Sequence, residues 1–168
     1  MPDAPVADDT PPLPAPLADF LQSGVSITVA SCNARLVPSI AKAVGCRVDP
    51  DRRRVTVLLF EAPAVQVLQD LREPGASLAV CFSRPSTHQT VQLKASQVRV
   101  APAEPGDLEV ARRCLALLQA DLAPLGFPAP MLEAVFWSAG QPLLALSFEP
   151  GDAFAQTPGP DAGREIAR

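Results

Sequence analysis

The sequence predicts a mainly β protein with flanking helices, in which about six antiparallel strands form a small barrel. Three observations lead to this fold class. Short apolar runs rich in β-branched residues follow one another with brief turns between them, which indicates hairpins and not a doubly wound parallel sheet. Hydrophobic residues make up 48% of the 168 residues, enough for one packed domain. One strand reverses its inward-facing phase midway, as strands that close a barrel do.

The first half of the chain is predicted to contain a short helix followed by three strands. Residues 17–23 form the helix, and Gly24 ends it, because glycine readily adopts the left-handed conformation that closes helices. Gly45 predicts a bend within the second strand, and residues 49–53 predict a hairpin turn. The three strands are expected at 25–32, 37–48 and 54–60.

The second half alternates helices with strands. Apolar residues at helical spacing predict an amphipathic helix over 63–73 and a longer one over 107–122, with Asp107 as its N-cap. Leu108, Ala111, Leu115, Leu118 and Leu122 form the apolar stripe of the longer helix. A further short helix is predicted over 128–137. Strands are expected at 76–83, 89–100 and 142–148.

The strand over 89–100 carries the phase reversal. Val91 and Leu93 lie on one face, whereas Val98 and Val100 lie on the other. Because side chains alternate strictly along a regular strand, this change requires an extra residue, and a β-bulge is predicted at 95–97.

The two termini are expected to lie outside a folded domain of residues 16–150. Residues 1–15 and 151–168 lack apolar periodicity and are predicted to be disordered tails. These tails account for the net charge of −4, since the acids and bases of the remainder balance. A neutral domain indicates binding neither to nucleic acid nor to an anionic membrane. Without a secretory signal or a long apolar run, a cytoplasmic protein is expected.

The cysteines and the single histidine give no sign of a metal site. Cys32, Cys46, Cys81 and Cys114 are far apart and contain no CxxC pair, so they are predicted to be reduced, buried thiols. The sequence also lacks the common nucleotide-binding, nucleophile-elbow and zinc-protease motifs.

The clearest candidate for a binding site is a row of polar side chains in the strand over 89–100. Thr90, Gln92 and Lys94 share one face of that strand. Hydroxyl, amide and ammonium groups on a rigid sheet could hold a phosphorylated or heterocyclic ligand, although the same row would also suit a sheet face that meets solvent. Further candidates come from the preceding strand end and loop and from opposite faces of the second strand: Ser83, Ser86, Thr87, His88, Ser39 and Lys42.

Three segments carry a resemblance to a known family: SITVASCNARLVPSIAKAVGCRVDPDRRRVTVLL, PAVQVLQDLRE and SLAVCFSRPSTHQTVQLKA. They look like the pyridoxamine 5′-phosphate oxidase-like, flavin-binding split-barrel family, and the resemblance covers about residues 17–148. The resemblance implies a homodimer that binds FMN at its interface. The flavin ring would then lie on the second and third strands, and basic and hydroxyl side chains would bind the phosphate. Arg35 and Lys42 loosely match the basic pair that the family's oxidase carries on its early strands.

Two functions follow as alternatives. The resemblance implies an FMN-dependent oxidoreductase, whose cofactor-binding residues would be Arg35, Ser39, Lys42, Ser83, Thr87, His88, Thr90, Gln92 and Lys94. The alternative is a flavin-free split-barrel protein that binds another small ligand or a partner protein. It is favoured by residues 60–66, which contain an acid and no base where FMN-binding relatives often have Thr or Ser followed by a base. A homodimer is also expected, since the apolar strand over 55–60 would otherwise be exposed.

Overall fold

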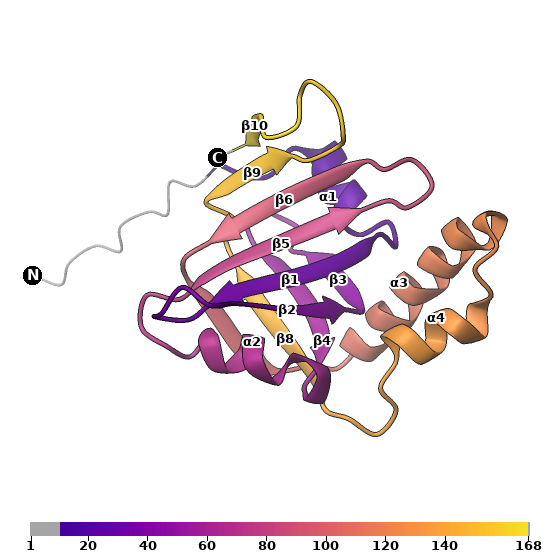
Figure 1. Ribbon diagram of the computed structural model, residues 1–168, viewed down its shortest axis with the longest axis horizontal. Helices are drawn as coiled ribbons and strands as arrows, with labels where there is room; N and C mark the ends of the chain where they lie inside the picture. The colour runs from indigo at the N-terminus through magenta and orange to yellow at the C-terminus, as the bar shows by residue number, and fades with distance from the viewer. Residues whose placement is uncertain (1–10, 168) are drawn as a thin grey trace, which may run out of the picture.

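The computed structural model describes residues 11–167 and contains two antiparallel sheets with helices around them (Figure 1). The large sheet has the strand order β10-β9-β6-β5-β1-β2, and the small sheet has the order β3-β4-β8-β7. The strands of the large sheet are β1 (Ser26–Cys32), β2 (Pro38–Ala43), β5 (Ser77–Ser83), β6 (Thr90–Ala95), β9 (Asp152–Ala155) and β10 (Glu165–Ala167). Those of the small sheet are β3 (Gly45–Val48), β4 (Val55–Phe60), β7 (Val98–Pro102) and β8 (Leu143–Phe148).

The prediction of a mainly β fold with flanking helices is confirmed, but the strand count differs. Residues 11–167 form ten strands in two sheets, where about six in one barrel were predicted. The increase arises because two predicted strands are each divided in two and the C-terminal region adds two more.

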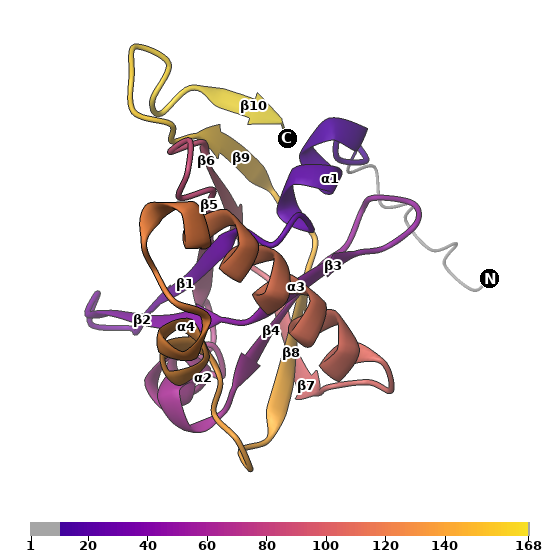
Figure 2. The same ribbon diagram turned by 90° about the vertical axis from the view of Figure 1, so that its right-hand side faces the viewer.

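The helices are arranged around the edges and sides of the sheets (Figure 2). They are α1 (Ala15–Leu21), α2 (Val65–Asp70), α3 (Asp107–Leu122) and α4 (Ala129–Phe136), with short 3-10 turns at Ala62–Ala64 and Ala123–Leu125. The bounds of α3 are those predicted, but its N-cap is Gly106, with a φ of 95°, and not Asp107. The predicted apolar stripe is also corrected at one position, since Leu108 is exposed and Cys114 is buried instead.

The hydrophobic core lies between the two sheets. The inner face of the large sheet contributes Val29, Val80 and Leu93, and that of the small sheet contributes Val57 and Leu146. On the outer face of the small sheet, a second cluster joins Leu58 and Phe60 to Ala111 of α3, with Phe136 and Trp137 packed against it. All six residues of β4 are therefore buried within one chain. The prediction that residues 55–60 would be exposed without a second copy of the chain is wrong.

Two segments carry the chain from one sheet into the other. The predicted strand over 37–48 divides at Val44 into β2 and β3, and the one over 89–100 divides at Ser96 and Gln97 into β6 and β7. The predicted bend at Gly45 and the predicted bulge at 95–97 thus mark the places where the chain changes sheets. Gly45 also lies against α3, because a Cβ there would be only 2.9 Å from the Cα of Ala111.

The terminal regions differ from the predicted tails. In the range 151–168, β9 pairs with the edge of β6 and β10 pairs with β9, while Ala153 is buried. These strands cover an edge of the sheet that would otherwise be left unpaired. At the other end, most of the predicted tail over 1–15 falls outside the described residues, but Leu13 is buried and its backbone N–H donates to the Arg52 carbonyl at 2.9 Å.

Candidate functional site

Most of the sequence-predicted polar row lies on the outer face of the large sheet, the face turned away from the core. Residues that are paired across antiparallel strands point to the same side of the sheet. The pairing of β2 with β1, β1 with β5 and β5 with β6 therefore places these polar residues on one surface. The structure brings together Lys42, Ser83, Thr90, Gln92 and Lys94 on this face. The alternation of apolar and polar residues predicted for 90–94 is confirmed, because Val91 and Leu93 point into the core.

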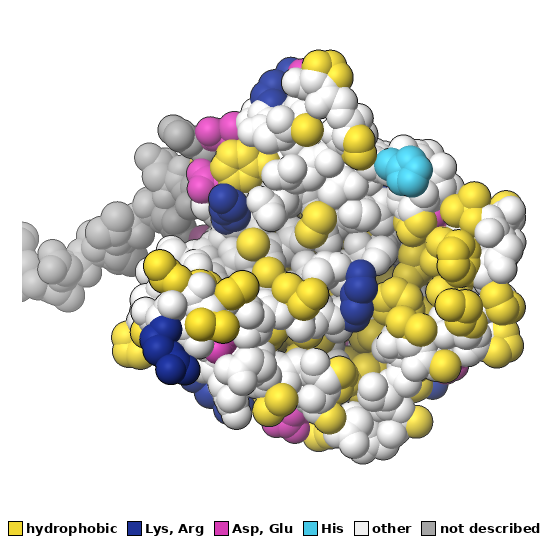
Figure 3. Space-filling model, in the orientation of Figure 1, with side chains coloured by type: hydrophobic (Ala, Val, Ile, Leu, Met, Phe, Trp, Pro, Cys, Tyr) yellow, Lys and Arg dark blue, Asp and Glu magenta, His cyan; other side chains and the backbone are white. Residues whose placement is uncertain are grey.

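The outer face of the large sheet is made largely of small side chains along β1 and β5. The neighbouring strands β1 and β5 place on it Ser26, Thr28, Ala30, Cys32, Ser77, Ala79, Cys81 and Ser83. Within the described part of the chain no helix crosses in front of these strands (Figure 1). In the space-filling view the middle of this face is mostly white, the colour of the backbone and of uncharged polar side chains, with scattered hydrophobic side chains, and more hydrophobic side chains gather beside it toward α3 and α4 (Figure 3). Such a surface would allow a planar molecule to approach the strands closely.

Lys42 is held on this face by neutral groups. Its Nζ donates to the hydroxyls of Thr28 at 2.8 Å and Ser26 at 3.2 Å, and it lies 6.0 Å from the ring centroid of Phe136 in α4. Among residues 11–167 it forms no ion pair with a carboxylate. Partial burial lowers the pKa of Lys42, and the nearby Cys81 acts in the opposite direction. Lys42 is therefore an exposed cation whose hydrogen-bond partners within residues 11–167 are all uncharged.

Lys94 is in a different environment on the same face. Its Nζ lies 4.9 Å from the ring centroid of Phe154, and its register partner on β9 is Asp152. It lines a shallow hollow of about 410 Å³ together with Ala30 and Ala79. Three strand spacings and one pair of residues separate Lys94 from Lys42, roughly 16 Å, so the two ammonium groups cannot hold one phosphate.

Three other predicted site residues lie at the ends of the large sheet. Arg35 is exposed in the turn between β1 and β2, whereas Thr87 and His88 are exposed in the hairpin between β5 and β6. The register of β1 with β5 puts these two connections at opposite ends of the strands, roughly 20 Å apart. One small ligand cannot contact both groups.

Ser39 lies on the inner side of β2, as the strand alternation requires. There its neighbour across the sheet is Ser31, whose hydroxyl donates to the buried Asp70 carboxylate at 2.7 Å. Gln66 donates to the same carboxylate at 3.0 Å. Hydrogen bonds from Gln66 and Ser31 outweigh burial and lower the pKa of Asp70, with a further contribution from Ser39. Ser39 therefore lies on the core side of β2, beside the Ser31–Asp70 hydrogen bond that joins β1 to α2, and not on the outer face.

This arrangement predicts a pH-dependent contribution of Asp70 to stability. A carboxyl whose folded pKa lies below its unfolded value stabilises the fold at neutral pH, and the contribution disappears as the pH falls through the folded value. Asp70→Asn should therefore be less stable than the wild type at pH 7, with the difference shrinking toward about pH 3. Urea unfolding over this pH range measures it. Ser31→Ala should show a weaker pH dependence than the wild type, and a constant Asp70→Asn difference would contradict the assignment.

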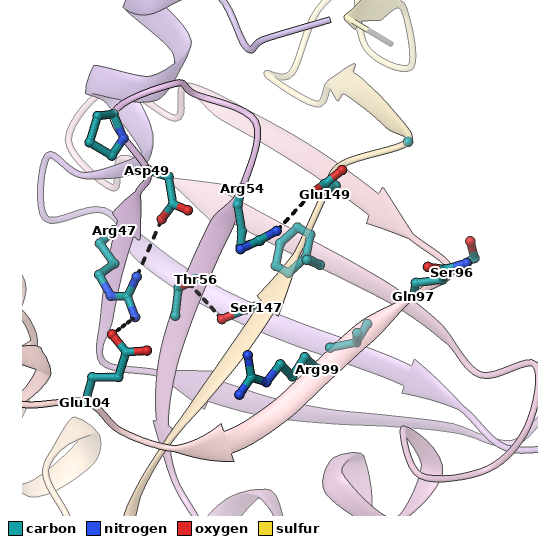
Figure 4. Close-up of a pocket in the computed structure, with 14 residues that line it drawn as sticks. Arg47, Asp49, Arg54, Thr56, Ser96, Gln97, Arg99, Glu104, Ser147 and Glu149 are labelled. Atoms are coloured by element: carbon teal, nitrogen blue, oxygen red, sulfur yellow. Dashed lines mark hydrogen bonds and ion pairs between the residues drawn. The ribbon is translucent and has the colours of Figure 1, made fainter. Parts of the chain in front are cut away.

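A second polar region lies on the small sheet and is not among the predicted site residues. Its outer face, where α3 and α4 leave it open, contains a cleft of about 940 Å³ (Figure 4). Arg47, Thr56, Ser147 and Arg99 form one row across its four strands. The available sequence signal was a single polar residue inside each of three apolar runs, VTVLLF, LLALSF and VRV. The row could not be assembled without knowing which strands are neighbours.

The described residues contain no group of three or more His, Cys, Asp or Glu side chains arranged to hold a metal ion. None of the helices in residues 11–167 has the length and apolar character needed to cross a membrane.

Comparisons with known proteins identify the fold. No family model and no curated protein matches the sequence. Among solved structures, a candidate pyridoxamine 5′-phosphate oxidase from Lactobacillus delbrueckii has a TM-score of 0.53 and 14% identity, covering 88% of this chain and 97% of that one. HupZ of Group A Streptococcus has a TM-score of 0.52 and 10% identity, covering 90% of this chain and 99% of that one. The resemblance predicted from the sequence is thus confirmed for the fold.

Proposed function

We propose that this chain, whose fold is that of the pyridoxamine 5′-phosphate oxidase-like proteins, binds FMN on the outer face of the large sheet and acts as an oxidoreductase. The observation that carries the proposal is Lys42, an exposed cation on an open sheet face whose Nζ has the hydroxyls of Ser26 and Thr28 as its hydrogen-bond partners. A phosphate could bind this ammonium through charge-assisted hydrogen bonds. The sequence resemblance independently points to a flavin. When bound, the flavin would provide the electron-transfer chemistry.

The residues present fit part of what FMN requires. Lys42, Ser26 and Thr28 offer one ammonium and two hydroxyls to an anionic group. The small side chains of β1 and β5 would let an aromatic ring lie close to the strands, with the exposed Ile40 and the aromatic Phe136 close to Lys42. These groups would bind and orient the cofactor. They include no general acid or base that would define a substrate.

The chain is also proposed to be a split-barrel homodimer, for a reason different from the one suggested by the sequence. Along β2 and the turn before it, Leu36, Val37 and Ile40 are exposed by 82%, 51% and 72% of their surface. Val65 of α2 adds another exposed apolar side chain. A second copy over this edge would remove these side chains from water and also cover the cofactor face. Light scattering should then give twice the 17.7 kDa mass of the chain, and Ile40→Asp should shift the protein toward monomer.

The alternative of a flavin-free protein is favoured by one observation. No second Lys or Arg accompanies Lys42 in its hydrogen-bonded group within residues 11–167, and the segment after β4 contributes Glu61. A protein of this kind would bind an uncharged or less charged ligand on the same surface. Purified protein that is colourless, and that stays free of flavin after incubation with excess FMN, would establish this alternative and reject FMN binding.

The two lysines of the outer face provide a matched pair of variants. Lys42→Met keeps most of the side-chain length but removes the charge that is proposed to meet the phosphate. The dissociation constant for FMN should rise about 10- to 100-fold, equivalent to about 1.5–3 kcal/mol, the usual contribution of a charged hydrogen bond. Lys94→Met should change it by less than about threefold, because Asp152 and Phe154 already accompany that ammonium. Titration of FMN followed by flavin fluorescence measures both. Equal constants for wild type and Lys42→Met would remove Lys42 from the site.

A further inference from the structure

The cleft on the small sheet is separate from the proposed flavin site. It lies on the opposite side of the molecule from the outer face of the large sheet, with both sheets between them. Its volume of about 940 Å³ is within the range of small-molecule sites. Ligand binding in this cleft would therefore not depend on flavin binding at the large sheet.

Polar groups at the floor of the cleft come from the two central strands of the small sheet. Thr56 and Ser147 face each other across β4 and β8, and their hydroxyl oxygens are 2.9 Å apart. One of the two hydroxyl hydrogens is used in this bond, so the pair retains one O–H that can donate to a ligand. Thr56 is fully buried, whereas Ser147 is partly accessible from the cleft. A hydroxyl pair at this position has no evident role in the hydrophobic core.

The three arginines of the cleft are not equivalent. Arg47 is bound by the carboxylates of Asp107 at 2.7 Å and Glu104 at 3.2 Å, and Arg54 is paired with Glu149 at 3.2 Å. Arg99, on the strand next to Ser147, forms no ion pair with any residue in 11–167. Figure 4 shows the bonded pairs around the cleft and Arg99 beside the hydroxyl pair without a partner.

The charges around the cleft indicate what net charge its ligand should carry. Arg47, Arg54 and Arg99 are balanced by Asp49, Glu104 and Glu149, so the lining is neutral as a whole. A polyanion would be repelled by the three carboxylates, whereas one anionic group could be bound by Arg99 and the adjacent hydroxyl. The carboxylates would in turn accept hydrogen bonds from hydroxyl or ammonium groups of the same molecule.

From this arrangement we propose that the cleft is a binding site for a small monocarboxylate that also carries hydroxyl or amino groups. Arg99 binds the carboxylate, and the Thr56–Ser147 pair donates a hydrogen bond to it. Glu104 and Glu149, on opposite rims of the cleft, accept hydrogen bonds from the remainder of the ligand. Arg47 and Arg54 keep these acidic groups in position through their ion pairs.

Gluconate and sorbitol are suitable probes, because both carry several hydroxyls but only gluconate has a carboxylate. Each is added to the full-length, isotope-labelled protein, and the backbone amide shifts of Thr56, Arg99 and Ser147 are followed by NMR. Gluconate should shift these amides with saturation below about 10 mM, and sorbitol should not. Citrate, with its additional negative charges, should bind more weakly than gluconate. Saturation by sorbitol, tighter binding of citrate, or no response to gluconate at that concentration would overturn the proposal.

Two arginine variants test the assignment of the carboxylate partner. Arg99→Met should raise the dissociation constant for gluconate at least about tenfold. Arg113→Met, at an exposed position of α3 that does not line the cleft, should change it by less than about twofold. Ser147→Ala should weaken gluconate binding to an intermediate extent. Melting curves confirm that each variant is folded, and equal affinities of the Arg99 and Arg113 variants would reject Arg99 as the partner.

Discussion

Gly24→Ala is expected to lower the free energy of unfolding by about 3–5 kcal/mol. Gly24 follows α1 with a φ of 77°, a conformation that is costly for any residue with a Cβ. The added Cβ would also overlap the Cβ of Leu117 in α3 and lie 3.0 Å from the Cys114 carbonyl oxygen. Because both neighbours belong to a helix that covers the small sheet, relief would require α3 to move as a unit. Urea unfolding of the variant measures the loss.

Gly75→Ala separates the two causes of this loss. Gly75 has the same φ of 77°, but a Cβ there would have no atom within 4 Å. Gly75→Ala should therefore lower the free energy of unfolding only through the unfavourable backbone conformation, by about 1 kcal/mol. If both alanine variants lose the same stability, the close contact between Gly24 and α3 contributes nothing, and the expected steric effect is absent.

Asp107→Ala is expected to cost about 2–4 kcal/mol, since it removes one partner from a buried ion pair. The Asp107 side chain is 3% exposed and accepts a hydrogen bond from Arg47 Nε at 2.7 Å. It also accepts the backbone N–H of Glu104 at 2.8 Å, which fixes the loop that leads into α3. Thermal and urea unfolding should both show the loss. Asp107→Asn should retain part of the stability, because an amide oxygen can still accept the Glu104 N–H.

The ion pair of Asp161 with Arg164 provides the control for Asp107. Their closest atoms are 3.7 Å apart, and both side chains are about two-thirds exposed. Asp161→Ala should change the free energy of unfolding by no more than about 0.5 kcal/mol, because solvent screens exposed pairs. A loss for Asp107→Ala as small as this would show that the buried pair does not stabilise the start of α3.

The alternation of apolar and polar residues along a strand was sufficient to predict which side chains share a strand face. Thr90, Gln92 and Lys94 appear together on the outer face because Val91 and Leu93 must point into the core. The same rule placed Ser39 opposite to Lys42. For these residues the physical cause is local, since the two-residue period of a strand decides the outcome before any neighbour is known.

Features that depend on distant neighbours could not be predicted in this way. A phase reversal within a strand is compatible with a bulge inside one sheet and with passage into another sheet, and only the pairing partners distinguish them. Likewise, the row of Arg99, Ser147 and Thr56 exists because β4 and β7 both pair with β8. The strand formed by Asp152–Ala155 contains one large apolar side chain, and its pairing depends on the open edge of β6.

The two places where the chain passes between the sheets also have consequences for folding. Val44 alone joins β2 to β3, and Ser96 with Gln97 joins β6 to β7, so neither sheet is formed from one continuous stretch of sequence. The pairing of Val55 with Phe148 closes a loop that spans more than half of the chain. Such distant pairing makes folding slow relative to a helical protein of this size. Amide hydrogen exchange should therefore find the most protected positions of both sheets opening together, in one cooperative unit.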